Sequence, residues 1–182
     1  MDSVNSNAYI GKGLINQTLR NYKIALDNFN KALSINKTYE GFLNRAVLKM
    51  ELQDLEEAWA DLEEAEKINP MRIETYINKG IIQMNSGSPE NAIIEFNKVL
   101  EKEKNYQAYL YRAVAKMNLS DYKGALGDLN TSVQLKPSAS AYYYRGISNI
   151  HLGNKTMGCS DLKLAKSLGN KNAIMEIRRY CK

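Results

Sequence analysis

The sequence repeats itself every thirty-three or thirty-four residues. Small residues recur at intervals of 33, 34, 33 and 33 residues, and they are Gly13, Ala46, Gly80, Ala113 and Gly146. Twelve residues after each of them stands a second small residue: Ala25, Ala58, Ala92, Ala125 and Gly158. An aromatic residue precedes each first small residue by four positions: Tyr9, Phe42, Tyr76, Tyr109 and Tyr142. This period predicts a repeat protein, in which each unit buries its apolar face against the next unit.

The spacing within each copy predicts two antiparallel helices in close contact, because the small residues lie among apolar residues at helical spacing. Residues favoured as helix N-caps occupy one position in every copy, at Asn21, Asp54, Ser88, Asp121 and Asn154. We therefore expect first helices near 7–19, 40–52, 74–86, 107–119 and 140–152. Second helices are expected near 23–35, 56–68, 90–102, 123–135 and 156–168, and a last helix near 172–181.

Composition excludes several classes of function. The chain has 182 residues and a net charge of +5, with 44% apolar residues, so it can bury a core. It has no apolar run of the roughly twenty residues that span a membrane, and no RNA-binding motif, zinc-finger spacing or basic helix that would indicate nucleic acid. A single histidine, His151, and two cysteines offer no metal set, and no phosphate-binding loop is present. We expect no enzymatic activity and no cofactor.

The N-terminus lacks the basic and apolar regions of a secretory signal, which as written indicates a cytoplasmic protein. A periplasmic or secreted location would follow if a signal peptide had been removed.

Two ladders of charged residues follow the repeat. Cations stand directly before the first small residue at Lys12, Arg45, Lys79, Arg112 and Arg145. Sixteen residues after each cation stand Asn28, Asp61, Glu95, Asp128 and Asp161. Partly buried charges need partners, so we expect these residues to form structural ion pairs, within a repeat or between neighbours. The alternative is that the line of cations binds an acidic ligand. The aromatic ladder is interpreted as core.

The two cysteines are expected to lie close together. Cys159 and Cys181 stand eleven residues on either side of Asn170, at the turn between the last two predicted helices. A helical hairpin places them level along its axis, and Cα atoms within about 7 Å can be bridged. The pair would form a disulfide in an oxidising compartment and would stay reduced, as small apolar packing groups, in the cytosol.

From residue 6 to about 171 this pattern of small, aromatic and proline positions resembles the tetratricopeptide repeat, in a form similar to bacterial members of unassigned function. The resemblance implies an all-α solenoid, a right-handed superhelix of five helix pairs with a C-terminal capping helix. The repeats would span 6–38, 39–72, 73–105, 106–138 and 139–171, after a leader at 1–5 and before a cap at 172–182.

The resemblance also implies a non-enzymatic adaptor that binds a peptide or protein in a concave groove lined by the first helices. The groove positions are Leu43, Asn44, Val47, Met50, Ile77, Asn78, Ile81, Met84, Leu110, Tyr111, Val114, Met117, Tyr143, Tyr144 and Ile147. Methionines offer an adaptable surface, and Asn44 and Asn78 could hold a peptide backbone through their amides. In the alternative interpretation, many of the apolar positions simply pack inward.

Chaperone-adaptor repeats hold a carboxylate with a set of lysine, arginine and asparagine residues, of which only an asparagine is present here. We therefore expect no binding of chaperone tails. The alternative function is a structural subunit that stacks or oligomerises through the ends of the solenoid.

Overall fold

The structure, a computed structural model, describes residues 2–182, with side chains from Asn5 onward. The described residues form eleven α-helices and no strand, which confirms the all-α prediction. The helices are α1 (Asp2–Thr18), α2 (Tyr22–Ile35), α3 (Tyr39–Glu51), α4 (Leu55–Ile68), α5 (Ile73–Asn85), α6 (Pro89–Lys102), α7 (Tyr106–Asn118), α8 (Tyr122–Leu135), α9 (Ala139–His151), α10 (Lys155–Ser167) and α11 (Asn172–Tyr180). The first helix begins at Asp2, within the residues predicted to form a leader.

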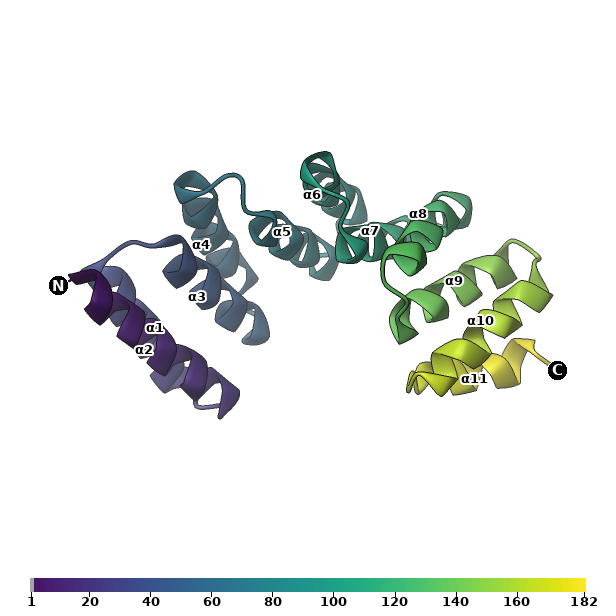
Figure 1. The fold of residues 1–182 in the computed structure, drawn as a ribbon, viewed down its shortest axis with the longest axis horizontal. Coiled ribbons are helices and arrows are strands. Elements are labelled where there is room, and N and C mark those ends of the chain that lie inside the picture. The colour runs from purple at the N-terminus through teal and green to yellow at the C-terminus, as the bar shows by residue number, and fades with distance from the viewer. Residues whose placement is uncertain (1) are drawn as a thin grey trace. The chain divides into compact units, whose positions relative to one another are not determined.

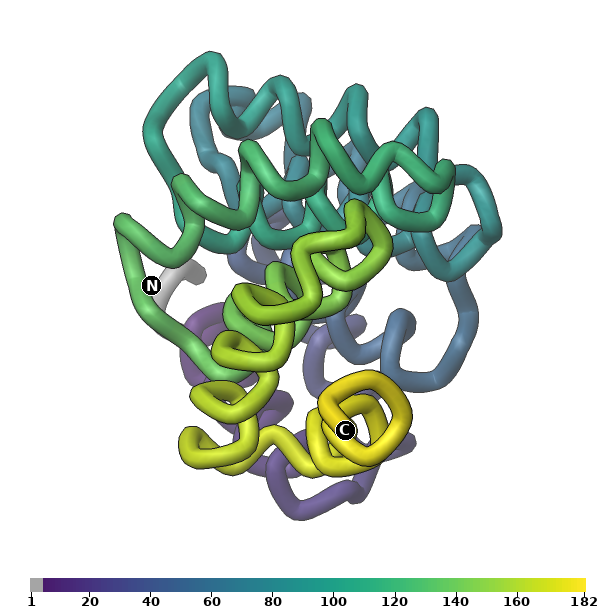
Figure 2. The backbone as a smooth tube through the Cα atoms, turned by 90° about the vertical axis from the view of Figure 1, so that its right-hand side faces the viewer, coloured from purple at the N-terminus to yellow at the C-terminus, as the bar shows by residue number. Residues whose placement is uncertain are grey.

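The chain forms two compact units, the first ending at Ile82 and the second spanning Gln83–Lys182, so that the boundary falls inside α5. In the first unit α1 packs on α2, α3 packs on α4, and α3 also contacts both helices of the preceding pair (Figure 1). In the second unit α7 packs on α8 and α9 packs on α10, with α8 and α9 in contact between the pairs. The last helix, α11, lies against α10, as the yellow end of the tube in Figure 2 shows. Each unit is therefore a stack of helix hairpins.

Small residues allow the two helices of a hairpin to touch. A Cβ atom added to Gly146 on α9 would lie 2.9 Å from the carbonyl oxygen of Gly158 on α10. The corresponding alanines, Ala46 with Ala58 and Ala113 with Ala125, are fully buried. One large apolar residue per second helix, at 0% exposure, fills the remaining space between helices: Phe29, Leu62, Phe96, Leu129 and Leu162. Close backbone contact and interdigitated side chains thus form the core of each unit.

The turns inside the hairpins share one backbone conformation. The residue before each expected N-cap has a positive φ, at Arg20, Gln53, Gly87, Ser120 and Gly153. Backbone hydrogen bonds such as Asp54 N to Lys49 O and Gln53 N to Met50 O close the preceding helix in a Schellman motif. Of the five expected N-cap side chains, only that of Asp121 accepts a hydrogen bond, from Gly124 N at 2.8 Å. The turns are therefore held mainly by the backbone.

Candidate functional site

Three of the expected ion pairs are present, and each ties the two helices of one hairpin. The guanidinium of Arg45 donates two hydrogen bonds to the carboxylate of Asp61, with Nη2–Oδ1 and Nε–Oδ2 distances of 2.6 and 2.9 Å. Arg112 donates the same two hydrogen bonds to Asp128, with Nη2–Oδ1 and Nε–Oδ2 distances of 2.6 and 2.9 Å. Arg145 donates them to Asp161, and both distances are 2.8 Å. The three aspartates are at most 6% exposed. The hydrogen bond that Arg145 donates to the buried carboxylate of Asp161 raises the pKa of Arg145 above its ordinary value.

Each arginine also reaches the preceding repeat. The Nη1 atoms of Arg45, Arg112 and Arg145 donate to the side-chain oxygens of Asn30, Asn97 and Asn130 at 2.7, 2.6 and 3.3 Å. These asparagines lie on the second helix of the preceding hairpin, fifteen residues before the arginine. This third partner was not predicted from the sequence, although one repeat position holds an asparagine at Asn30, Asn97 and Asn130. The cations thus join neighbouring repeats.

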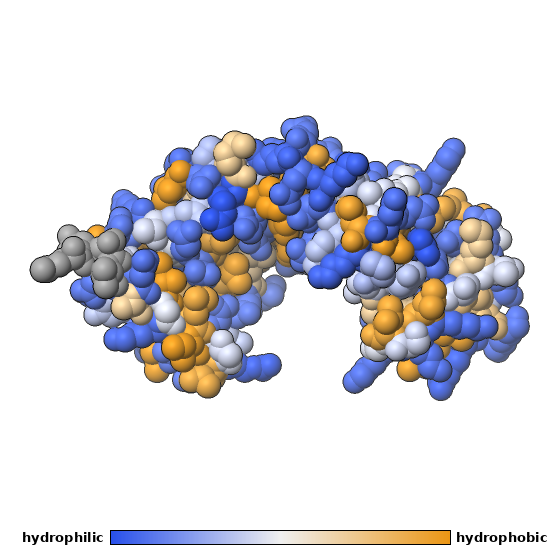
Figure 3. All heavy atoms as spheres, in the orientation of Figure 1, coloured by the Kyte–Doolittle hydropathy of each residue, from blue (hydrophilic) through white to orange (hydrophobic). Residues whose placement is uncertain are grey.

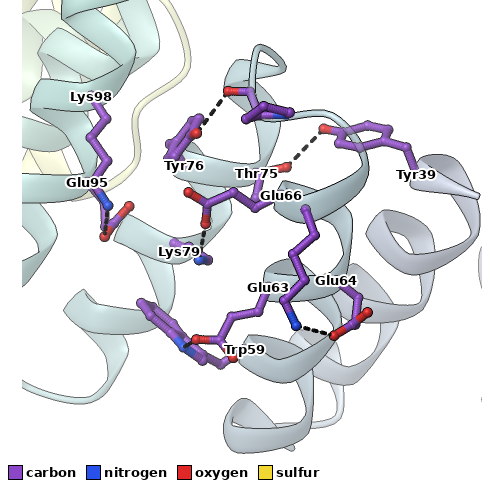
Figure 4. Close-up of polar contacts among 12 residues, drawn as sticks. Tyr39, Trp59, Glu63, Glu64, Glu66, Thr75, Tyr76, Lys79, Glu95 and Lys98 are labelled. Carbon is purple, nitrogen blue, oxygen red and sulfur yellow. Dashed lines mark hydrogen bonds and ion pairs between the residues drawn. The ribbon is translucent and has the colours of Figure 1, made fainter.

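The expected partners Lys79 and Glu95 belong to different units, so their pairing stays a prediction. Within the first unit, Lys79 on α5 pairs with Glu66 on α4, and its ammonium lies 4.9 Å from the ring centre of Trp59 (Figure 4). Glu95 contacts Lys98 on its own helix at 2.8 Å. A lysine ammonium is a point charge without the guanidinium fork, so it does not require a carboxylate opposite two nitrogens.

The aromatic residues of the ladder make cation–π contacts with the cations. A cation lies over the aromatic ring three residues earlier in the four pairs Lys12–Tyr9, Arg45–Phe42, Arg112–Tyr109 and Arg145–Tyr142, at 5.3, 5.8, 5.5 and 5.4 Å from the ring centre. Residues three apart are neighbours on a helix surface, so this contact could have been predicted from the spacing. The charge and aromatic ladders both belong to the scaffold.

A cavity of about 450 Å³ opens between α1 and α3 in the first unit. Its lining residues are Leu14, Gln17, Thr18, Arg20, Tyr22, Asn44, Val47 and Glu51. Asn44 and Val47 were predicted to line a groove, and the structure places both in this cavity. Arg20 and Tyr22 were missed, because they lie in the turn after α1 and at the first residue of α2, where the face pattern of the first helices makes no prediction.

The cavity combines apolar and hydrogen-bonding surface. Leu14 is 42% exposed and Val47 is half-buried, so both offer apolar contact. Among the described residues, no hydrogen bond engages the side-chain amides of Asn44 and Gln17, which therefore present donors and acceptors to a ligand. Figure 3 shows apolar side chains on the surface of this unit, around the end where α1 passes into α2. Such a surface can hold an extended peptide segment.

Other predicted groove residues contribute to the core. Leu110 is 9% exposed and belongs to a buried cluster with Leu129 and Ala141, so it contributes to the core. Half-buried members that pack against buried clusters are Leu43, Met50, Met84, Tyr111, Met117, Tyr143, Tyr144 and Ile147. The remaining members, Ile77, Asn78, Ile81 and Val114, are half-buried on α5 and α7. The eight residues that pack against the clusters contribute to the core, and a binding groove along the first helices stays a prediction.

The structure brings the two cysteines together. Cys159 on α10 and Cys181, directly after α11, form a disulfide with a Cα–Cα distance of 5.7 Å. Cys181 packs against a buried cluster of Leu162, Ala165 and Ala173. The disulfide thus fastens the end of the chain to the last hairpin.

The described part of the chain contains no group of three or more potential metal-ligating side chains. No helix among those residues has the length and apolar character needed to cross a membrane.

Comparison with known proteins agrees with this architecture. A family model described as "Tetratricopeptide repeat" matches residues 6–39 and 73–105. The chain matches no curated protein sequence.

Solved structures show the same fold at low identity. TTC0263, a thermophilic tetratricopeptide-repeat protein of Thermus thermophilus, is 15% identical, with 95% of this chain and 96% of that chain covered and a TM-score of 0.73. YrrB, described as a tetratricopeptide-repeat protein with an unusual peptide-binding site, is 15% identical, with 94% and 90% covered and a TM-score of 0.71. A chain of the Cut9–Hcn1 complex reaches a TM-score of 0.84 at 16% identity, with 97% of this chain and 36% of that chain covered.

Tetratricopeptide-repeat proteins are generally non-enzymatic adaptors or scaffolds for protein–protein interaction. The sequence period, the stacked helix hairpins and the family match to two of the repeats lead to the same assignment. Residues 6–39 and 73–105 match the tetratricopeptide repeat, and the chain has the fold of solved tetratricopeptide-repeat structures.

Proposed function

We propose that the chain is a non-enzymatic adaptor that binds an extended peptide segment of a protein partner in the cavity between α1 and α3. The observation that supports this most directly is the pair of unengaged amides, Asn44 and Gln17, beside the apolar surface of Leu14 and Val47. An amide can donate to a backbone carbonyl and accept from a backbone N–H, so it can hold a peptide irrespective of sequence. The peptide-binding site in the description of YrrB adds support by analogy of fold.

Arg20 and Glu51 add opposite charges to the cavity lining. A bound segment would therefore carry an apolar side chain against Leu14 and Val47, and charged residues on either side of it would contribute to the choice of sequence. Charges at an exposed rim affect the rate of association and specificity more than affinity, so binding should weaken moderately as salt is added.

The test begins with peptides selected from a display library against the whole chain, whose affinities are then measured by isothermal titration calorimetry. Asn44→Ala should weaken a selected peptide roughly fivefold, the value of about one neutral hydrogen bond. Leu14→Asp should weaken it further, because it places a charge on the apolar wall. The matched control is Asn91→Ala, at an exposed position on α6 in the other unit. Selected peptides that bind equally well to all four proteins would contradict the proposal.

A second candidate function, a structural subunit that associates through its end, is favoured by Ile15. This side chain is 62% exposed on α1. The residues at the same repeat position are covered, with Leu48, Ala115 and Ser148 at 0% and Ile82 at 4%. The C-terminal unit has α11 over its last hairpin. Association would therefore join the α1 ends of two copies around a two-fold axis, with Ile15 of each copy at the contact.

Light scattering at increasing protein concentration tests this second candidate. A dimer should form and should be lost in Ile15→Asp but not in Ile94→Asp, which changes an equally apolar side chain that is 54% exposed on α6. A mass that stays monomeric at every concentration would contradict it.

A further inference from the structure

A second cavity, of about 280 Å³, lies entirely within the C-terminal unit and is lined by residues of α8, α9 and α10. Its most buried lining residues are Asn149 on α9 and Asp161 on α10, which are 3% and 5% exposed. Leu126 on α8 and Met157 on α10 provide apolar surface, and Met157 is 60% exposed. The exposed residues Asn130 and Ser160 and the guanidinium-bearing Arg145 complete the lining, so the cavity has mixed polar and apolar walls and a buried polar end.

The repeats themselves show what this polar end lacks. In the second repeat the ammonium of Lys49 lies 2.9 Å from Oδ2 of Asp61, the oxygen that also accepts from Arg45. In the fourth repeat Lys116 lies 2.7 Å from Oδ2 of Asp128 in the same way. Both aspartates therefore have two cations.

The fifth repeat has an asparagine, Asn149, at the position of these lysines. The carboxylate of Asp161 contacts Arg145, and the described residues supply no second cation to it. The space that a lysine ammonium fills in two other repeats is therefore unfilled here.

Asn149 provides a second, independent observation. Its side-chain oxygen is buried and accepts no hydrogen bond. A buried acceptor without a donor costs about 1–3 kcal/mol, so such atoms are rare unless something supplies the donor. Asn149 and Asp161 both line the cavity, and the side-chain oxygens of each have capacity for one more donor.

The geometry points to a binding site for an alkylammonium group. Its nitrogen would occupy the place of the lysine ammonium in the second and fourth repeats and donate to Oδ2 of Asp161 and Oδ1 of Asn149. Its alkyl chain would lie between Leu126 and Met157, which an ammonium ion alone would leave without contact. A lysine side chain of a partner protein and a free alkylamine share this chemistry. The site lies in a different unit from the α1–α3 cavity, so either one can fail without the other.

The first experiment titrates the full chain with n-butylammonium and, separately, with the neutral isostere n-butanol, while NMR records the backbone amides of α9 and α10. Butylammonium should shift the amides around Asn149 and Asp161 and bind about tenfold or more tightly than butanol, because its contacts are charge-assisted. Equal binding of the two probes, or no shift with butylammonium, would overturn the proposal.

Two variants identify the site. Asn149→Lys supplies the ammonium from the chain itself, so it should raise the melting temperature and abolish butylammonium binding. Lys116→Asn makes the fourth repeat resemble the fifth and should create a second site, detected as new shifts in α7 and α8. Retained binding in a folded Asn149→Lys protein would overturn the proposal, whatever the outcome for Lys116→Asn.

The source of the ammonium is distinguished with a short glycine-rich peptide that carries one internal lysine. Tighter binding of this peptide than of butylammonium, with loss on acetylation of the lysine, would identify a protein lysine as the ligand. Binding of butylammonium alone would identify a free amine. Binding of the acetylated peptide as strongly as the unmodified one would show that no ammonium is recognised.

Discussion

The guanidinium of Arg112 and the carboxylate of Asp128 meet as two parallel hydrogen bonds, Nη2–Oδ1 at 2.6 Å and Nε–Oδ2 at 2.9 Å. Lys116 adds a second cation to the same carboxylate at 2.7 Å. The equivalent Asp161 contacts Arg145 without such a lysine. The two arginine–aspartate pairs have nearly the same geometry, but Asp161 depends on its arginine for charge neutralisation more than Asp128 does.

This difference predicts unequal costs of removing the arginine. Arg145→Ala leaves Asp161 buried without a cation and should lower the free energy of unfolding by about 3 kcal/mol or more. Arg112→Ala should cost less, because Lys116 continues to neutralise Asp128. Urea denaturation of both variants, followed by circular dichroism, measures the difference. Equal losses would show that Lys116 contributes nothing to Asp128.

Ser148 should be replaceable with a gain in stability. Its hydroxyl is buried at 0% exposure and makes no hydrogen bond, at a repeat position where other repeats have Leu48 and Ala115. Ser148→Ala removes the unsatisfied hydroxyl and improves helix propensity, so it should raise the free energy of unfolding by about 1 kcal/mol. Differential scanning calorimetry should show a higher melting temperature. As a control, Ser132→Ala should destabilise, because the Ser132 hydroxyl donates to Tyr106 O at 2.9 Å.

The disulfide should hold α11 against the last hairpin. Reduction, or Cys159→Ala with Cys181→Ala, opens a loop with a sequence separation of 22 residues. The chain-entropy model assigns such a loop about 3 kcal/mol of stability. Amide hydrogen exchange in α11 should therefore accelerate, while exchange in α3 and α4 of the other unit stays unchanged. Two titratable thiols in the denatured, unreduced protein would show that the bond does not form.

Stability should fall at alkaline pH, in part through Tyr39. Burial raises the pKa of Tyr39 above its ordinary value of 10.0, while its hydroxyl accepts a hydrogen bond from Thr75 at 3.1 Å. A raised folded-state pKa means that the unfolded chain loses this proton first. The stability that the protonated Tyr39 contributes is therefore complete below pH 10.0 and is lost as the pH rises through the folded-state pKa of Tyr39.

Urea denaturation at increasing alkaline pH measures how the free energy of unfolding declines in the wild type and in Tyr39→Phe, whose side chain cannot ionise. The decline should be shallower in the variant. The same slope in both proteins would mean that Tyr39 does not contribute, and that other groups such as Tyr143, whose pKa burial also raises, account for the loss.

Much of the fold follows from the sequence alone. The repeat period predicts the helix pairs, because small residues twelve apart allow two helices to touch, as at Gly146 and Gly158. The interval of sixteen residues between Arg112 and Asp128 matches their hydrogen bonds across one hairpin. These relationships are local, since both partners lie within one repeat and the turn between them has a fixed length.

The tertiary structure decided the contacts between repeats. Helical periodicity shows which face of a helix is apolar, but it does not show how far one hairpin rotates on the next. That rotation places Leu110 in the core and Asn44 beside a cavity, although both were assigned to the same groove. It also places Lys79 against Glu66 of the preceding hairpin. The cavity at Asn149 depends on three helices at once, so the repeat pattern predicts the substituted position while only packing reveals the space that it leaves.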